Sequence, residues 1–160
     1  MSNMVSLLLL LCFTACLCTV YVGSLLNGVL KEMIASVLSI VEFSVDDCLC
    51  LHRLLASVIS ASTDLFHRCH QSSIAMPVEV TIHNCVPVWP RFRELTSFFQ
   101  LGLGQVMDRW TDGKGPLAMQ LSAAELARLV VAVFEKTSRR DAFIAQLAAA
   151  AAAASDVTQQ

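Results

Sequence analysis

The stretch Leu25-Leu26-Asn27-Gly28-Val29-Leu30-Lys31-Glu32-Met33-Ile34-Ala35-Ser36-Val37-Leu38-Ser39-Ile40-Val41 decides the fold class. Its apolar residues fall at positions 25, 26, 29, 30, 33, 34, 37, 38 and 41. This is the spacing of the buried face of an amphipathic helix. Lys31 and Glu32 lie off that face. The stretch therefore predicts a helix that packs one side against the rest of the chain.

A second helix is predicted after Ser44-Val45-Asp46-Asp47, which has the pattern of a capping box. The serine hydroxyl can accept a hydrogen bond from the Asp47 amide, and both carboxylates oppose the positive end of the helix dipole. We expect this helix to end near Arg68. Its buried side is predicted to consist of Leu51, Leu54, Leu55, Val58, Leu65 and Phe66.

The following segment, 71–87, has no helical spacing of its apolar residues. Within it, Val78-Glu79-Val80-Thr81-Ile82 alternates as a short strand would, and we expect an extended loop there. Pro90 suits the first turn of a third helix that continues to Trp110, weakened at Gly102 and Gly104. Its buried side is predicted to consist of Phe92, Leu95, Phe99, Val106 and Trp110.

Two further helices are predicted beyond Asp112-Gly113-Lys114-Gly115-Pro116, which must break the third one. Ser122-Ala123-Ala124-Glu125 is a second capping box and opens a helix with an apolar inner face. Thr137 or Ser138 is expected to cap the last helix, which buries Phe143, Ile144 and Leu147. Alanines 148–154 should extend it, because alanine has the highest helix propensity.

The sequence thus predicts an all-α fold, an antiparallel helical rod or bundle of about five helices with at most one short strand. We divide the chain into an apolar leader at 1–22, a helical domain at 23–147 and an alanine-rich tail at 148–160. The leader is either a non-native segment or a signal-like one. Val5 to Val22 is long enough for a marginal transmembrane helix or a signal-peptide core. However, residues 1–4 contain no Lys or Arg, and no Ala-x-Ala cleavage site follows. A small membrane-anchored or secreted helical protein is therefore the alternative prediction.

Composition excludes several classes of protein. The chain has 11 Lys and Arg against 13 Asp and Glu, a net charge of -2. Charged residues make up 15% of it, against about 25% in typical globular proteins. The chain is thus too apolar to be disordered and too neutral to bind nucleic acid through phosphate contacts. Its seven cysteines are an odd number, which indicates a reduced, intracellular protein without a paired disulfide framework.

A zinc site and a cysteine nucleophile are the enzyme-like alternatives. Thiol and imidazole side chains cluster in the sequence at Cys48, Cys50, His52, His67, Cys69, His70, His83 and Cys85. Residues two apart on a helix diverge by about 200°. Cys48 and Cys50 therefore cannot share one tetrahedral zinc ion without unwinding the helix. No motif singles out one cysteine as a nucleophile.

A nucleotide site is equally unsupported. Gly113-Lys114-Gly115 lacks the upstream glycine and the downstream Ser or Thr of a phosphate-binding loop. The sequence therefore predicts a non-enzymatic protein with no catalytic residue, no metal site and no cofactor.

Two tryptophan motifs remain to be explained. Val86-Pro87-Val88-Trp89-Pro90 flanks one indole with prolines, and Asp108-Arg109-Trp110-Thr111-Asp112-Gly113-Lys114-Gly115-Pro116-Leu117 places the other before a glycine-rich turn. These surroundings predict fixed turns whose indoles pack against adjacent helices. Lys136, Arg139 and Arg140 form a small basic cluster, which is either a solvated surface or a contact to an acidic partner.

At these residues the sequence resembles the C-terminal segment of the Zeste-white-ten family, whose members are centromere/kinetochore and vesicle-tethering proteins. Four features carry the resemblance, in order: Val86 to Leu95, the Asp108 to Leu117 block, the helix Ser122 to Phe134, and Thr137-Ser138-Arg139-Arg140. The central block is the most specific of them. With the two helices before these features, the resemblance covers about 25 to 147.

The resemblance implies a scaffold subunit of two assemblies, of which this chain is the last segment. One is a kinetochore complex with Rod and Zwilch, which recruits dynein with dynactin and mitotic checkpoint proteins. The other is an endoplasmic reticulum tether that captures Golgi-derived vesicles and supports SNARE assembly. In both, the C-terminal part is implied to bind a large helical-solenoid subunit, Rod or its tether counterpart. The implied location is cytoplasmic, peripheral on the endoplasmic reticulum membrane and at the kinetochore in mitosis.

The expected interaction surface is the Asp108 to Leu117 block with the Arg139 and Arg140 pair. The alternative is that Trp110 and the turn after it only lock the bend between two helices. The candidate partner-binding or structural residues are Trp89, Pro90, Asp108, Arg109, Trp110, Asp112, Gly113, Lys114, Gly115, Pro116, Arg139 and Arg140.

Overall fold

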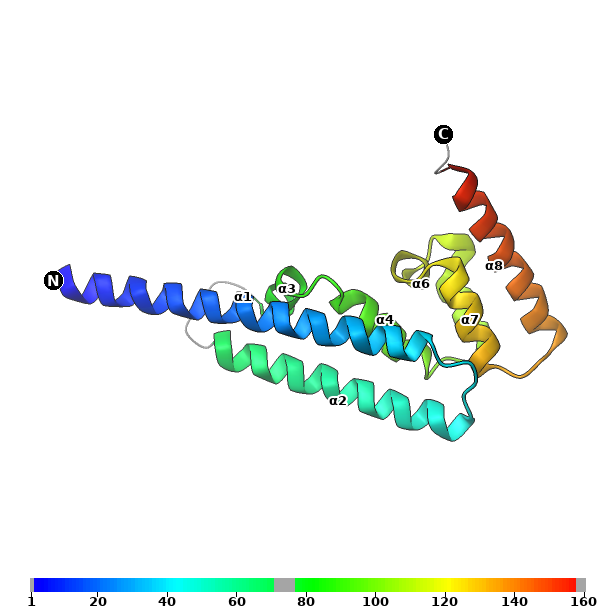
Figure 1. Ribbon diagram of the computed structural model, residues 1–160, viewed down its shortest axis with the longest axis horizontal. Helices are drawn as coiled ribbons and strands as arrows, with labels where there is room; N and C mark the ends of the chain where they lie inside the picture. Colours follow the sequence, from blue (N-terminus) through cyan, green and yellow to red (C-terminus); the bar gives the residue numbers. More distant parts are fainter. Residues whose placement is uncertain (1, 71–76, 158–160) are drawn as a thin grey trace.

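The computed structural model describes the backbone of residues 2–70 and 77–157, and the side chains of residues 17–69 and 77–153. Within these ranges the chain forms eight α-helices and no β-strand, so the predicted all-α class is confirmed. The elements are α1 (Ser2–Leu38), α2 (Val45–His70), α3 (Val78–Cys85), α4 (Trp89–Phe98), α5 (Leu103–Trp110), the 3-10 turn η1 (Thr111–Gly113), α6 (Pro116–Gln120), α7 (Ala123–Val133) and α8 (Ser138–Val157). Figure 1 shows α1 and α2 as a long antiparallel pair, with α6, α7 and α8 gathered far from the N-terminus.

The predicted amphipathic helix is confirmed as the C-terminal half of α1, which buries Leu30, Ile34 and Val37. The prediction was wrong at the edges of its apolar face, because Leu25 and Val29 are exposed and Val41 lies beyond the helix end at Leu38. α1 begins at Ser2, so the predicted boundary at residue 22 lies inside one continuous helix. The Ser44 capping box is also confirmed. The Asp47 amide donates to Ser44 Oγ over 3.1 Å, and the Ser44 amide donates to Asp47 Oδ2 over 3.0 Å.

The buried side of α2 is narrower than predicted. Leu55 and Phe66 are buried, but Leu54 is 61% exposed and Leu65 is 43% exposed. The reason is that α2 packs against α1, α3 and α4, and its remaining sides face solvent in the described part of the chain. Leucines at the edge of that face remain in solvent, so the prediction was wrong for these two residues.

Residues 78–82 are helical, which corrects the predicted extended loop or strand. Pro77 is extended (φ -60°, ψ 140°) and acts as the N-cap of α3. Its carbonyl accepts hydrogen bonds from the amides of Val80 and Thr81, at 3.0 and 3.2 Å. Val78, Val80 and Ile82 are spaced two residues apart, as in a strand. Val78 and Ile82 are also four residues apart, which places them on one helix face, where Ile82 is fully buried. Period-two alternation was therefore misleading over so short a segment.

The predicted third helix is two helices, α4 and α5, which corrects its continuity. The helix breaks after Phe98, and Gly102 restarts it in an extended conformation (φ -74°, ψ 158°). The Gly102 amide donates to the Gln105 side chain over 2.9 Å. The predicted inner side chains are nevertheless buried on both pieces, and they are Phe92, Leu95, Phe99, Val106 and Trp110. The five-residue α6 was not predicted.

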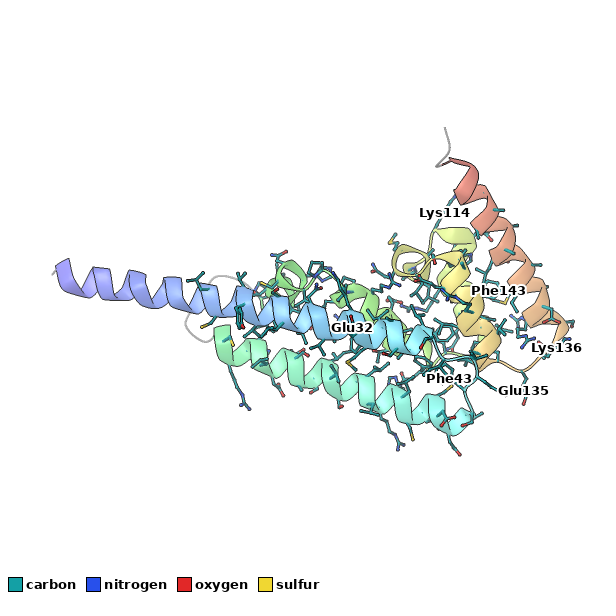
Figure 2. All side chains as sticks on the ribbon, in the orientation of Figure 1. Glu32, Phe43, Lys114, Glu135, Lys136 and Phe143 are labelled. Atoms are coloured by element: carbon teal, nitrogen blue, oxygen red, sulfur yellow. The ribbon has the colours of Figure 1, made fainter. Side chains whose placement is uncertain are left out.

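Both C-terminal helices begin as predicted. The Ser122 amide donates to Glu125 Oε2 over 3.0 Å, and the Glu125 amide donates to Ser122 Oγ over 3.3 Å. Thr137 caps α8 by accepting from the Arg140 amide over 3.2 Å. Phe143 lies between α8 and α7 (Figure 2) and is 2% exposed. α8 continues through the alanines, as expected.

Four phenylalanines form a row of ring contacts where the connection after α1 meets α4 and α7. Phe43, from the connection between α1 and α2, meets the Phe99 ring edge-on at 5.3 Å between centroids. Phe98 meets Phe99 at 5.6 Å and Phe134 at 6.0 Å, again edge-on. Edge-to-face geometry is favourable because the positive ring edge faces the negative face of its neighbour. This aromatic row joins the connection, α4 and the end of α7.

Apolar side chains on α1 and α2 remain exposed. Leu17, Val20, Leu25 and Val29 on α1 are each more than half exposed. Two windows, Leu17–Ser39 and Val45–Cys69, are long and apolar enough to cross a membrane by length and composition, a test that core helices and signal sequences also pass. The first window also supplies buried core residues such as Leu30. The targeting alternative at Val5 to Val22 rests mostly on side chains before Leu17, which lie outside the described ones.

The Glu125 carboxylate links α7 to α4 and makes stability depend on pH. Burial raises the pKa of Glu125, but the Ser122 hydrogen bonds and the Arg91 guanidinium, 2.7 Å away, outweigh it and lower the pKa from its ordinary value. A carboxylate with a lowered folded-state pKa stabilises the fold above its unfolded pKa and loses that effect as pH falls through the folded value.

We therefore expect Glu125→Gln to cost about 1 kcal/mol at pH 7, the usual value of a lost cap. Its difference from the wild type should shrink between about pH 5 and pH 3. The urea unfolding midpoints of the variant and the wild type, at about pH 5 and about pH 3, measure this difference in stability. Glu32→Gln is the matched control, because Glu32 is exposed and its side chain forms no hydrogen bond or ion pair with the described residues. A Glu125→Gln difference that does not change with pH would contradict the expectation.

Candidate functional site

The Asp108 to Leu117 block forms a tight left-handed turn between α5 and α6. Three consecutive residues have positive φ: Thr111 at 44°, Asp112 at 51° and Gly113 at 84°. Thr111 is β-branched and is rarely found in this region. The turn closes through the Gly115 amide, which donates to the Trp110 carbonyl over 2.9 Å, and the Lys114 amide, which donates to the Thr111 carbonyl over 3.0 Å.

The block is anchored by its inward-facing side chains. Trp110 is 4% exposed and packs in the core. Arg109 donates two hydrogen bonds to the Glu94 carboxylate of α4, at 2.6 and 2.7 Å. Both bonds come from one guanidinium nitrogen, Nη2, and this charge-assisted contact ties the end of α5 to α4. Trp89 is fully buried at the start of α4, and Pro90 follows it in the first turn. Both indoles therefore face inward, which settles whether they pack against adjacent helices or face a partner, an alternative that the composition left open.

The outward-facing side chains of the block form a polar rim. Asp108, Asp112, Lys114 and Pro116 are exposed, whereas Gly115 is buried. Asp112 Oδ1 accepts a hydrogen bond from Gln146 of α8, so the tip of the turn is tied to the last helix. Figure 2 shows Lys114 at the tip, away from α1. This rim faces solvent.

The two predicted arginines occupy different environments. Arg139 is exposed, and its guanidinium lies 3.4 Å from the position that a Cβ on Gly104 would take, so it covers α5. The Arg140 side chain is only 13% exposed. It donates to the Phe134 carbonyl over 2.9 Å and to Asp141 at 3.2 and 3.3 Å. Arg140 thus stabilises the C-terminal end of α7, where carbonyls lack helical partners. Arg139 is the member of the pair that is free to meet an acidic group.

The cysteine and histidine residues do not gather into a site in the described part of the chain. No three His, Cys, Asp or Glu side chains there are arranged to hold a metal ion. Cys48 is buried, and burial together with the neighbouring Asp47 carboxylate raises the pKa of its thiol. A raised pKa keeps the thiol protonated, the opposite of what a nucleophile needs. His70 lies where side chains are not described.

His52 instead joins two helices. Its Nδ1 lies 3.0 Å from the Thr96 carbonyl oxygen of α4. Because a carbonyl only accepts, Nδ1 carries the proton, and Nε2 accepts from the Gln100 side-chain amide. One imidazole therefore fastens α2 to α4. This role accounts for His52 without a metal.

A groove beside α7 is a surface that the sequence analysis missed. It lies between residues 38–41 and the outer side of α7, and Ile40, Val41, Arg128 and Val131 line it. The sequence does contain an indication of this groove. Leu129 to Val133 are all apolar, and five consecutive residues of a helix cannot all lie on its buried face. Val131, in the middle of that run, is 50% exposed.

Comparison with known proteins finds one matching family model and several similar proteins. Residues 13–147 match the family model described as the ZW10 C-terminal helical domain. The "Centromere/kinetochore protein zw10 homolog" of Rattus norvegicus is 32% identical over 125 residues, 78% of this chain and 16% of that protein. The mouse homologue, from Mus musculus, is 30% identical over the same shares, and the zw10 protein of Drosophila grimshawi is 27% identical over 123 residues, 77% of this chain and 16% of its own. The chain thus corresponds to 16% of the length of these relatives.

Proposed function

The chain belongs to the ZW10 (Zeste-white-ten) family, and from this we propose that it is a non-enzymatic interaction module of a kinetochore and vesicle-tethering scaffold. The family match across residues 13–147 is the observation that carries the proposal. The relatives are named centromere/kinetochore proteins. The packing supports a scaffold role, since the described core is filled by apolar side chains while several large apolar side chains on α1, α2 and α7 face outward. Exposed apolar surface of this kind is typical of sites for protein partners.

We further propose a helical-solenoid partner of the Rod type at the kinetochore, or its counterpart in a tether at the endoplasmic reticulum. Dynein with dynactin, and SNAREs, would then associate indirectly, and the chain would be cytoplasmic and peripheral on the membrane. The test is capture from mitotic and interphase cell extracts with the tagged full chain, read by mass spectrometry. Recovery of a large solenoid subunit supports the proposal. Recovery of chaperones alone would refute it.

Arg139 is the cation of the predicted surface that we expect to matter for capture. Arg139→Glu should lower recovery of the solenoid partner about tenfold, because it places a negative charge against an acidic partner surface. The helical circular dichroism signal should not change, since Arg139 is exposed. Arg53→Glu is the matched control, because Arg53 is exposed on α2 and forms no ion pair with the described residues. Arg140→Glu serves a different purpose and should lower thermal stability, because it removes the contact to the Phe134 carbonyl. Equal recovery with Arg139→Glu and Arg53→Glu would refute the role of Arg139.

A further inference from the structure

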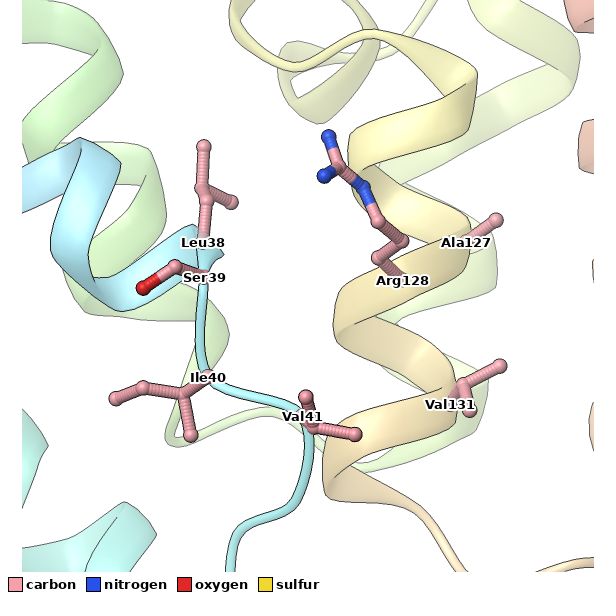
Figure 3. A pocket seen from close by; sticks show the side chains of 7 residues that line it. All are labelled: Leu38, Ser39, Ile40, Val41, Ala127, Arg128 and Val131. Carbon is pink, nitrogen blue, oxygen red and sulfur yellow. The ribbon is translucent and has the colours of Figure 1, made fainter.

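The groove beside α7 has the properties of a docking site for a helix. We propose that it binds an amphipathic helix of a partner protein, whose apolar side covers Val41 and Val131 and whose carboxylate pairs with Arg128. This inference rests on the proposed function and adds the place and the chemistry of one contact. Figure 3 shows the two walls, residues 38–41 on one side and α7 on the other.

The groove is formed before any partner binds. The Phe43 amide donates to the Ala132 carbonyl of α7 over 2.9 Å, and the Phe43 ring packs on Phe99. These contacts hold the connection after α1 at a fixed distance from α7. A preformed site binds more tightly than one that must be ordered first, because less conformational entropy is lost.

The walls are apolar and open to solvent. Val41 is 84% exposed, Val131 is 50% exposed and Ile40 is 43% exposed. Neighbouring hollows share Leu38 at one end and Val41 with Val131 at the other, so the groove runs along α7. α7 has 11 residues, or about 16 Å at 1.5 Å per residue. A hollow of this form fits a convex helix, whereas a lipid surface would meet only its rims.

The charged side chains beside the groove indicate which kind of helix fits it. Arg128 is exposed, and no carboxylate of the described residues forms an ion pair with it. Figure 3 shows it reaching from α7 toward the gap opposite Leu38. On the same side Arg91 is already neutralised by Glu125, while Lys31 adds another cation without an ion pair in the described chain. This end of the groove is therefore positive. At the far end the carboxylates of Glu42 and Glu135 accompany Lys136, and Arg140 is paired with Asp141, so that end is not positive. An apolar helix with carboxylates near Arg128 complements this distribution.

Photo-crosslinking within the captured complex tests the occupant. Val131→p-benzoylphenylalanine in the full chain should crosslink to a partner segment with helical apolar spacing and at least one carboxylate. Met119→p-benzoylphenylalanine is the matched control, since Met119 is 75% exposed on α6, outside the groove. The proposal is overturned if position 131 crosslinks to a second copy of this chain, or yields only the products seen at position 119.

Charge reversal then tests the pairing. Arg128→Glu should lower capture at least fivefold without changing the melting temperature, and Glu→Lys in the crosslinked partner segment should restore capture to the Arg128→Glu chain. Arg53→Glu again serves as the control. If Arg128→Glu and Val131→Asp both leave capture of the solenoid partner intact, the groove proposal fails and the proposed function stands. If the unaltered chain captures no such partner, both fail.

Discussion

Gly115→Ala is expected to destabilise the fold by at least about 3 kcal/mol, a large part of the roughly 5 to 15 kcal/mol that holds a domain together. A Cβ at this position would lie 2.0 Å from the Arg109 carbonyl oxygen and 2.7 Å from the Arg109 carbonyl carbon. Both atoms belong to the backbone, so no side-chain rotation can relieve the clash. Relief requires moving the end of α5, where Arg109 is bound to Glu94 and Trp110 is buried. Urea denaturation followed by circular dichroism measures the loss.

Two other glycines provide the comparison. Gly28→Ala should be neutral or stabilising by up to about 1 kcal/mol, because nothing lies within 4 Å of the added Cβ and alanine favours helix. Gly113→Ala should fall between the two at about 1 to 2 kcal/mol, since its φ of 84° disfavours an L side chain but the space is open. Comparable losses at Gly115 and Gly28 would mean that the turn does not have the packing described.

The large stability loss expected at Gly115 indicates a structural role for part of the Asp108 to Leu117 block. Its specific residues divide into an inner set that builds the turn and an outer rim that a partner can reach. Trp110, Arg109 and Gly115 belong to the inner set by burial and bonding, and Lys114 belongs to the rim. The inner side chains form the locked bend, which is one of the two sequence-based hypotheses. The other hypothesis, an interaction surface, is limited to the rim. The contribution of the rim to binding stays a proposal.

Most helices could be predicted because their signals are local. Capping boxes at Ser44 and Ser122 depend only on residues three apart, and both are formed. The amphipathic spacing of α1 is long enough to be unambiguous. α3 and the break after Phe98 could not be predicted in the same way. A segment of eight residues fits two periodicities. For the break, the sequence marks a weak point only at Gly102 and Gly104, whereas α4 already ends at Phe98.

The candidate site was predictable as a motif but not as a surface. The sequence could not show that Trp89 and Trp110 point inward, or that Arg140 is used by the Phe134 carbonyl. Those facts depend on contacts between segments far apart in the chain. The groove beside α7 was missed for the same reason. Val41 and Val131 are 90 positions apart in the numbering, and only the folded chain makes them neighbours across one hollow.

Phe98→Ala is expected to cost about 4 kcal/mol and to lower the melting temperature by roughly 10 °C. Phe98 is fully buried and touches two aromatic rings edge-on, Phe99 and Phe134. Truncation removes both contacts and leaves a cavity between α4 and the end of α7. Phe98→Leu keeps most of the volume and should cost only about 1.5 kcal/mol. Val131→Ala, on the exposed side of α7, should change stability by less than about 0.5 kcal/mol.

A double-mutant cycle separates the aromatic contacts from simple loss of volume. Phe98→Leu combined with Phe134→Leu should show a coupling of about 0.5 to 1.5 kcal/mol, the usual value of an edge-to-face pair. Additive effects would mean that the two rings contribute by burial alone. The row also supports the groove, because Phe43 connects it to the wall beside α7. Phe98→Ala should therefore weaken partner capture at temperatures where the chain is still folded, whereas Phe98→Leu should not. Capture that persists unchanged in folded Phe98→Ala would mean that the aromatic row stabilises the core without positioning the groove.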